Sequence, residues 1–450
     1  MFSASPLALS LAAGLGLGIA YTLSPLTVWV TAGFLVMLRY AGRDLPSHER
    51  RWLLGLLGVA FLLRVAAIGA LFLGHAHDSQ SAGILFGDEA YALTRSWRMR
   101  NVLLDIPQLK YDYMTAYEDY GRSSFLWVMT YLQVLAGPAP YGLRVLNVAM
   151  FLGAVLLLFR MARLAFGSFA AFSGAVVLLF LPTLFFWSIS VLKEPFYFVL
   201  TVLVLAAAVS AAQATTWRTR ILSVTVAIVA LWALRDLRAG ALTLAVSGLV
   251  GGITTAIVSR RPWRLAAASA AALIAAIVAL ATPAPRQVVL GNIDRAAAMH
   301  AGHVFTVGHA YKLLDEAFYV FPDAAPRFAL TPSEAGRFVV RAGFAYLFAP
   351  LPWQMATAGE LAYLPEQLLW YLLVLLAPIG LVAAFRRDRF VASLLFAYLL
   401  PTAVVVALTT GNVGTLIRHR TLIIPYLVWV SCLGFAVTFG RFGAPEVPAR

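Results

Sequence analysis

Apolar runs of about 20 residues recur along the chain and constrain its fold more than any other feature. A helix that crosses the hydrocarbon core of a membrane needs about 20 such residues. By that criterion the sequence predicts twelve spans, near residues 4–21, 24–40, 52–74, 142–161, 168–186, 192–213, 219–234, 239–258, 265–281, 366–385, 390–409 and 420–440. We therefore expect an all-α polytopic membrane protein.

The composition supports this class and excludes several others. Of 450 residues, 61% are hydrophobic and 12% are charged, whereas soluble chains have roughly 45–50% and 25%. The single cysteine, Cys432, rules out a disulfide scaffold. A net charge of +14 in so apolar a chain is better explained by arginines kept on the cytoplasmic side than by nucleic-acid binding.

The basic residues predict the orientation of the chain. Sixteen arginines fall in alternate short connections and in the C-terminal segment, so the positive-inside rule places both termini in the cytoplasm. Two long loops, 75–141 and 282–365, then face outward together with sixteen of the twenty acidic residues. Long loops carry more charge of every kind, which is an alternative explanation of the acid count.

The same pattern predicts four segments. Residues 1–51 hold two spans and a cytoplasmic connection, 52–281 form a transmembrane core that includes the first outer loop, 282–365 form the second outer loop, and 366–450 hold three spans. The apolar stretches 125–137 and 337–353 are expected to be helices at the outer interface, because a crossing by either would invert the later arginine clusters.

The first outer loop contains a pair of acids, Asp88 and Glu89, followed by Tyr91. A carboxylate near the membrane surface and close to a basic residue could act as a general base for a hydroxyl group. The alternative is that both acids complement the dipole of a helix N-terminus. Tyr91 is a candidate substrate-binding residue.

A second charged feature is the short turn after the fifth span, which places Lys193 and Glu194 at the outer mouth of the sixth, with Pro195 in the first helical turn. A charged pair in so apolar a turn is costly unless it has a partner. Both side chains are candidates for substrate binding, although Glu194 would also complement a helix dipole.

Several arginines are expected on the outer face, against the positive-inside trend. They are Arg235 and Arg238 in the segment RDLRAG, Arg286, and Arg418 and Arg420 in GNVGTLIRHRT, where His419 lies between them. The planar guanidinium suits phosphate oxygens and stays charged at any working pH. Their outward position favours a specific anionic partner over solvation alone, most of all for Arg418 and Arg420. Arg235, Arg238, Arg418 and Arg420 are therefore candidates for binding phosphate, and His419 is a candidate substrate-binding residue.

The second outer loop contains three histidines at positions 300, 303 and 309. They lack an accompanying cysteine or acid motif, so solvated or hydrogen-bonded histidines are the favoured interpretation and no metal site is predicted.

These segments together resemble a family. The pair in DEAY at 88–91, the stretch FLWVMTYLQVLAG at 125–137 and the turn FFWSISVLKEP at 185–195 are similar to those of the polyprenyl-phosphate-dependent glycosyltransferases of the GT-C superfamily, in the protein O-mannosyltransferase and aminoarabinose transferase branch. The resemblance covers about residues 52–213. It implies that the acidic pair carries the essential carboxylate, although Tyr91 follows the pair at a shorter spacing than in the family.

The expected function is therefore an inverting glycosyltransferase of the bacterial inner membrane that works at the periplasmic face in cell-envelope glycan synthesis. It would move a sugar from a polyprenyl-phosphate donor to a glycan, lipid or protein acceptor. Asp88 or Glu89 would be the base. No definite cofactor is indicated, and the sequence leaves room for a divalent cation. The alternatives are a polymerase or ligase of lipid-linked polysaccharide, with its chemistry in the second loop, and a flippase, for which corresponding broken helices are lacking.

Overall fold

The computed structural model describes residues 24–74, 85–119, 121–306, 309–319, 330–355 and 357–440, and a few residues between 5 and 18. Over this part of the chain the secondary structure is helical and contains no strand. The predicted all-helical class is therefore confirmed.

Eight helices are long and apolar enough to cross a membrane. They are α3 (Ser47–Gly74), α7 (Pro140–Phe166), α10 (Glu194–Gln213), α11 (Trp217–Leu234), α12 (Ala241–Val258), α13 (Pro262–Ala281), α16 (Ala358–Arg387) and α17 (Arg389–Thr409). Two further pairs are bent by 63° and 68° and bring the number to ten if each is one span: α8 (Ser168–Phe180) with α9 (Pro182–Ser188), and α18 (Val413–Arg420) with α19 (Ile424–Thr438).

The two remaining predicted spans differ from these. The expected span 24–40 folds as α2 (Pro25–Ala41), which has 17 residues and is shorter than the other candidates. The expected span 4–21 lies largely outside the described residues. The long apolar helices make the chain a multi-pass membrane protein. The number of twelve spans and the orientation of the chain in the membrane stay predictions.

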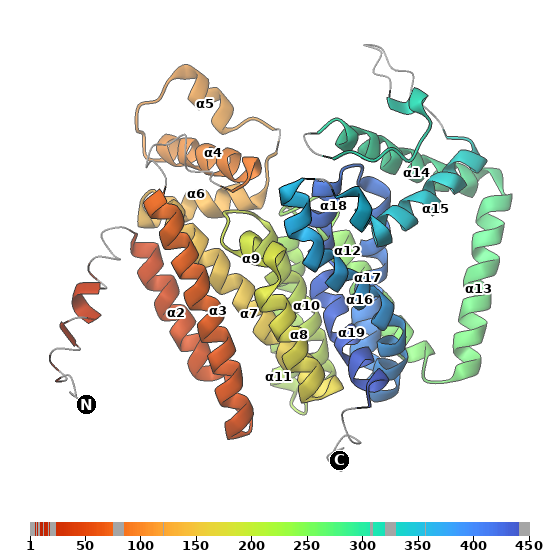
Figure 1. Cartoon of the computed structure of the whole chain (residues 1–450), viewed down its shortest axis with the longest axis horizontal. Coiled ribbons are helices and arrows are strands. Elements are labelled where there is room, and N and C mark those ends of the chain that lie inside the picture. The colour runs from red at the N-terminus through yellow and green to blue at the C-terminus, as the bar shows by residue number, and fades with distance from the viewer. Residues whose placement is uncertain are drawn as a thin grey trace. The chain divides into compact units, whose positions relative to one another are not determined.

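Contacts group the chain into two compact units. The first consists of Met1–Arg160 and Ala175–Leu242. Within it, α4 (Gly87–Leu103), α5 (Lys110–Ala116) and α6 (Ser124–Ala136) lie at one end of α3 and α7 (Figure 1). The stretch predicted as an interfacial helix at 125–137 is α6, whose 13 residues are too few to cross a membrane.

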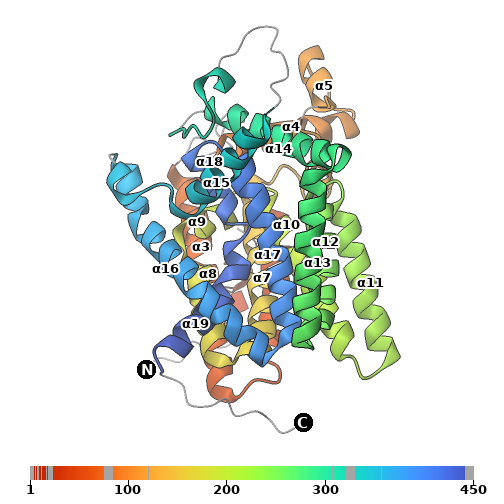
Figure 2. The same ribbon diagram turned by 90° about the vertical axis from the view of Figure 1, so that its right-hand side faces the viewer.

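The second unit consists of Met161–Gly174 and Thr243–Arg450. Its long helices α16, α17 and α19 run alongside one another, and α14 (Pro283–Val304) and α15 (Pro332–Phe348) lie at one end of them (Figure 2). The predicted interfacial stretch 337–353 corresponds to α15 and the short 3-10 helix η2 (Pro352–Gln354); another 3-10 helix, η1, spans Glu316–Tyr319. The boundaries of the four segments expected from the sequence stay predictions.

Helix ends in the second unit follow local sequence signals. Asp388 caps α17 by accepting hydrogen bonds from the backbone N–H groups of Phe390 and Val391, at 3.0 Å each. Thr331 with Glu334 forms a capping box at the start of α15. These side chains satisfy N–H groups that the first helical turn leaves without partners.

Glycines set the closest helix crossing of this unit. A Cβ atom on Gly380 of α16 would lie 1.8 Å from the carbonyl oxygen of Val430 in α19, and one on Gly434 of α19 would lie 2.3 Å from that of Leu376. The two backbones can approach this closely only because both positions lack a side chain, which is a common arrangement between transmembrane helices.

Candidate functional site

The acidic pair lies in the first turn of α4, and its two members have different surroundings. Glu89 is fully buried, whereas Asp88 is exposed. Successive residues of a helix point about 100° apart, so one acid of the pair faces the protein and the other faces solvent. Of the two acids, Asp88 is therefore the one that solvent reaches.

Glu89 is held by an ion pair and two backbone groups. Its Oε1 lies 2.8 Å from Nη1 of Arg144 and accepts a hydrogen bond from the backbone N–H of Val191 at 2.6 Å. Its Oε2 accepts one from the N–H of Leu85 at 3.3 Å. Arg144 is also fully buried, and a buried charge is stable only when paired and hydrogen bonded. The carboxylate of Glu89 therefore joins three segments.

The turn before α10 is fixed from α7 by the same arginine and by a residue one helical turn away. Arg144 donates from Nη1 to the carbonyl of Ile189 at 3.0 Å. Asn147 donates from Nδ2 to the carbonyls of Ser190, at 2.6 Å, and Leu192, at 3.0 Å. The turn predicted to carry Lys193 and Glu194 is thus tied to α4 through Glu89 and to α7 through two buried polar side chains.

A third buried side chain, Arg64 of α3, holds the bend between α8 and α9. Its Nε donates to the Ser188 hydroxyl at 2.7 Å, and its Nη2 donates to the carbonyl of Leu179 at 2.8 Å. Pro182 opens α9 and lacks an N–H, so carbonyls near the break need other donors. The guanidinium also packs against the rings of Phe151 and Phe185. Arg64 thus donates to groups on both sides of the break between α8 and α9.

Downstream of this turn, Glu194 begins α10 and is buried. Its Oε1 lies 3.7 Å from Nη1 of Arg238. Lys193 is the half-buried N-cap residue of the same helix. The structure therefore brings together Glu194 and Arg238, two residues that the sequence selected separately.

Arg238 also lines a pocket of about 530 Å³, which we call the arginine pocket. The pocket lies between the residues that lead into α6 and the connection from α11 to α12, which are joined by a hydrogen bond of 3.0 Å from the N–H of Ser124 to the carbonyl of Asp236. In the described part of the chain it is lined by Arg122, Ser123, Ser124, Trp127, Arg235, Asp236, Arg238 and Ala239.

The arginine pocket has the chemistry of an anion and sugar site. Three guanidinium groups offer donors to phosphate oxygens, and two serines add hydroxyl groups. Trp127 provides an aromatic wall and is itself stacked on Tyr131, with ring centroids 5.9 Å apart. Asp236 is the acid of this lining. Sequence reasoning selected Arg235 and Arg238 but missed Arg122 and Trp127, which are more than 100 residues away in the chain.

Tyr91 does not line the arginine pocket and contacts Arg95 and Glu118 instead. Its hydroxyl accepts from Nη1 of Arg95 at 2.7 Å and donates to Oε1 of Glu118 at 3.0 Å. Arg95 also donates to the carbonyls of Ala116 and Glu118. Partial burial raises the pKa of Tyr91 above its ordinary value. These contacts attach the segment after α5 to α4, so Tyr91 shapes the loop above the acidic pair.

The other predicted phosphate-binding arginines, Arg418 and Arg420, belong to α18 in the second unit. Arg420 is buried, and its guanidinium donates to the carbonyls of Tyr346 and Ala349 and to Oε1 of Gln367, at 3.0 Å for the last. It also packs on the ring of Trp370 at 4.8 Å. This geometry favours a structural role that holds α15 and α16 to α18.

Histidines of the second loop approach α18 from α14. The ring of His303 lies 6.1 Å from that of His419, and its Nδ1 is 2.7 Å from the carbonyl of Thr409. His300 is buried, with Nε2 3.0 Å from the hydroxyl of Tyr319 and Nδ1 2.6 Å from the carbonyl of Thr410. Among the described residues, no three His, Cys, Asp or Glu side chains are placed to hold a metal ion.

The hydrogen bonds around Tyr319 fix the tautomer of His300. The Tyr319 hydroxyl accepts from the N–H groups of Leu313 and Leu314, at 2.9 and 3.0 Å. Its own hydrogen is then directed to Nε2 of His300, so the proton of the neutral ring is on Nδ1 and is donated to Thr410. Burial lowers the pKa of His300 below its ordinary value, which keeps this arrangement neutral at pH 7.

Comparison of the chain with protein-family models, with curated proteins and with solved structures found no match in any of the three.

Proposed function

We propose that the protein is an integral-membrane glycosyltransferase that moves a sugar from a polyprenyl-phosphate donor to an acceptor hydroxyl at the periplasmic face of the inner membrane. The observation that carries the proposal is the connected series of contacts in the first unit. It runs from the acidic pair of α4, through the turn before α10 and Glu194, to Arg238 and the arginine pocket. A membrane-embedded chain with a cationic, hydroxyl- and tryptophan-lined pocket suits a sugar phosphate carried on a lipid.

In the proposed reaction, the exposed carboxylate of Asp88 accepts the proton of the acceptor hydroxyl. The hydroxyl oxygen forms a bond to the anomeric carbon, the bond from that carbon to the phosphate oxygen breaks, and polyprenyl phosphate leaves with the electron pair. The configuration at the sugar is inverted. Arg122, Arg235 and Arg238 stabilise the negative charge that develops on the phosphate.

The remaining polar residues have supporting roles in this proposal. Glu89, Arg144 and Asn147 fix the turn that presents Glu194, and Glu194 orients Arg238 by their ion pair. Lys193 and Tyr91 stay candidates for contact with the sugar or acceptor, and His419 with Arg418 stays a candidate in the second unit. The proposed site faces the periplasm of a bacterial inner membrane, in accordance with the arginine distribution.

The test is transfer of radiolabel from a panel of polyprenyl-phosphate sugars to acceptors from the producing cell, with the purified full chain in lipid nanodiscs. Asp88→Asn should reduce the rate by about 100-fold or more, since a general base contributes about 10²–10⁴-fold. The matched control is Asp44→Asn, which changes an acid that is 90% exposed in the α2–α3 connection. Full transfer by Asp88→Asn would eliminate Asp88 as the base.

A second set of variants tests the arginine pocket. Arg122→Gln, Arg235→Gln and Arg238→Gln should each lower transfer by about tenfold or more. Each variant loses one positive charge that stabilises the negative charge developing on the phosphate. Arg218→Gln near the start of α11 is the control, since Arg218 does not line the pocket. If none of the three lowers transfer more than the control does, the pocket is not the phosphate site.

The alternative activities predict other losses. A polysaccharide polymerase or ligase with its chemistry in the second loop would lose activity through residues 300–316, such as His303, and would tolerate Asp88→Asn. A flippase would move the labelled lipid across a vesicle membrane without forming a new glycosidic bond. The transfer assay distinguishes all three, because only glycosyl transfer at the proposed site requires Asp88.

A further inference from the structure

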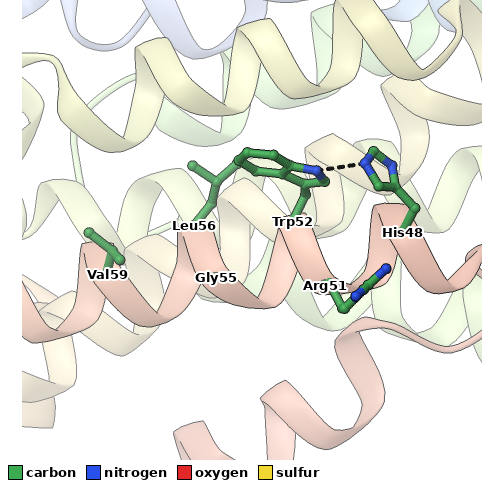
Figure 3. Close-up of a pocket in the computed structure, with 6 residues that line it drawn as sticks. All are labelled: His48, Arg51, Trp52, Gly55, Leu56 and Val59. Atoms are coloured by element: carbon green, nitrogen blue, oxygen red, sulfur yellow. Dashed lines mark hydrogen bonds between the residues drawn. The ribbon is translucent and has the colours of Figure 1, made fainter.

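A groove of about 580 Å³ runs along the N-terminal half of α3, at the opposite end of this helix from α4. In the described part of the chain it is lined by His48, Arg51, Trp52, Gly55, Leu56 and Val59. Their spacing of three and four residues places them on one helical face. In Figure 3, His48, Trp52 and Leu56 extend from the same side of α3, with the indole ring between the other two side chains.

The chemistry of the groove changes along its length. The exposed cation Arg51 and the imidazole of His48 are at the end near the α2–α3 connection, and Leu56 and Val59 are apolar. From Arg51 to Val59 the helix rises about 12 Å, which is most of one leaflet of a hydrocarbon core about 30 Å thick. The end with Arg51 would suit a charged headgroup, and the part with Leu56 and Val59 would suit an apolar chain.

The tryptophan of the groove presents an apolar ring. The indole Nε1 of Trp52 donates to Nε2 of His48 at 2.8 Å, so the indole N–H already has a partner on the same helix. Trp52 is 59% exposed and Val59 is 50% exposed. Tryptophan at the boundary between headgroups and acyl chains is common in membrane proteins. An indole ring at this position suits the boundary between headgroups and acyl chains.

Gly55 provides the space below the indole. A Cβ atom built at this position has no other atom within 4 Å, so the absence of a side chain is not explained by a close backbone crossing. Glycine in a helix interior is less favourable than alanine. The open notch that it leaves continues the groove from Arg51 to Val59.

We propose that this groove is a binding site for a glycerophospholipid with an anionic headgroup. The phosphate lies on Arg51, and one acyl chain follows Trp52, the notch at Gly55, and Val59. The occupant is inferred from charge complementarity with Arg51 and from an apolar face exposed on a membrane-length helix. The site is separate from the arginine pocket, and the proposal does not depend on glycosyl transfer.

The experiment is native mass spectrometry of the purified full chain titrated with phosphatidylglycerol or phosphatidylcholine of identical acyl chains. The first phosphatidylglycerol should bind about fivefold more tightly than the first phosphatidylcholine, which is the effect expected of one arginine near an anionic headgroup. Arg51→Gln should abolish this preference. Arg50→Gln should keep it, because Arg50 is an exposed neighbour that does not line the groove.

A second variant tests the acyl-chain part of the site. A Cβ at position 55 has no other atom within 4 Å, so Gly55→Leu places its side chain in the notch and should weaken binding of the first molecule of both lipids. Gly69→Leu on the same helix is the matched control, since a Cβ there also has no atom within 4 Å. Equal affinity of the wild type for the two lipids would overturn the proposal. So would equal losses in Arg51→Gln and Arg50→Gln, or a protein dimer that Gly55→Leu dissociates.

Discussion

The two acids of α4 should respond very differently to removal of their charge. Glu89→Gln keeps the size of the side chain and leaves an oxygen that can still accept from the N–H of Val191. It removes the negative charge that pairs with Arg144 at 2.8 Å, between two fully buried side chains. Leaving one partner of a buried pair uncompensated costs about 3–5 kcal/mol. We expect Glu89→Gln to be destabilised by about this amount.

Asp88→Asn is the internal comparison, because Asp88 is exposed in the same helical turn. It should lose about 1 kcal/mol or less, mainly from the weaker interaction with the helix dipole. The stabilities can be compared by reversible unfolding in mixed micelles titrated with dodecyl sulfate, with helical circular dichroism as the signal. Glu89→Gln should therefore shift the unfolding midpoint strongly, and Asp88→Asn should lose transfer with little shift.

A double variant separates loss of the pair from loss of packing. Glu89→Gln with Arg144→Gln removes both charges and keeps amide groups that can accept from the N–H of Val191 and donate to the carbonyl of Ile189. It should recover most of the stability that Glu89→Gln loses. The reasoning is refuted if Glu89→Gln is no less stable than Asp88→Asn, since the buried pair would then contribute nothing measurable to the fold.

Three further predictions concern the second unit. Gly380→Ala should lose about 1–3 kcal/mol of stability by overpacking, because its Cβ would meet the carbonyl of Val430. The control Gly291→Ala should keep its stability, since a Cβ there has no atom within 4 Å, and equal unfolding midpoints for the two variants would contradict the close crossing. Arg420→Met should lose at least about 2 kcal/mol in the same titration, since buried carbonyls would lack donors, and an unchanged midpoint would contradict its structural role. Burial lowers the pKa of His300, so stability should be full above its ordinary value of about 6.5 and decline by at most about 1.4 kcal/mol per pH unit as the pH falls toward the lowered folded value. His300→Gln should lack this decline in thermal unfolding at pH 7 and pH 5.

Local sequence signals identified much of what the structure shows. The apolar runs predicted the long helices, and the turn with Lys193 and Glu194 was expected at the start of a helix, where α10 begins at Glu194. A helix N-terminus is one of the two interpretations of the acidic pair, and the pair lies in the first turn of α4. These features depend on residues close together in the chain.

Several residues of the candidate site were missed. Arg144 lies inside the predicted span 142–161, and a charge there should have indicated a buried partner, because charged side chains in apolar spans require one. Arg122 and Trp127 had no local signal that linked them to Arg235 and Arg238. Their grouping depends on a contact between segments more than 100 residues apart.

The sequence by itself determined that the chain is a helical membrane protein, because the cost of placing backbone and charges in hydrocarbon leaves long apolar helices as the available structure. Only the tertiary structure decided that Glu89 faces inward and Asp88 outward, and that Arg420 is engaged with carbonyl groups while Arg238 lines a pocket. The reason is that hydropathy and helical period are properties of neighbouring residues. The partner of a charge is set by how distant helices pack.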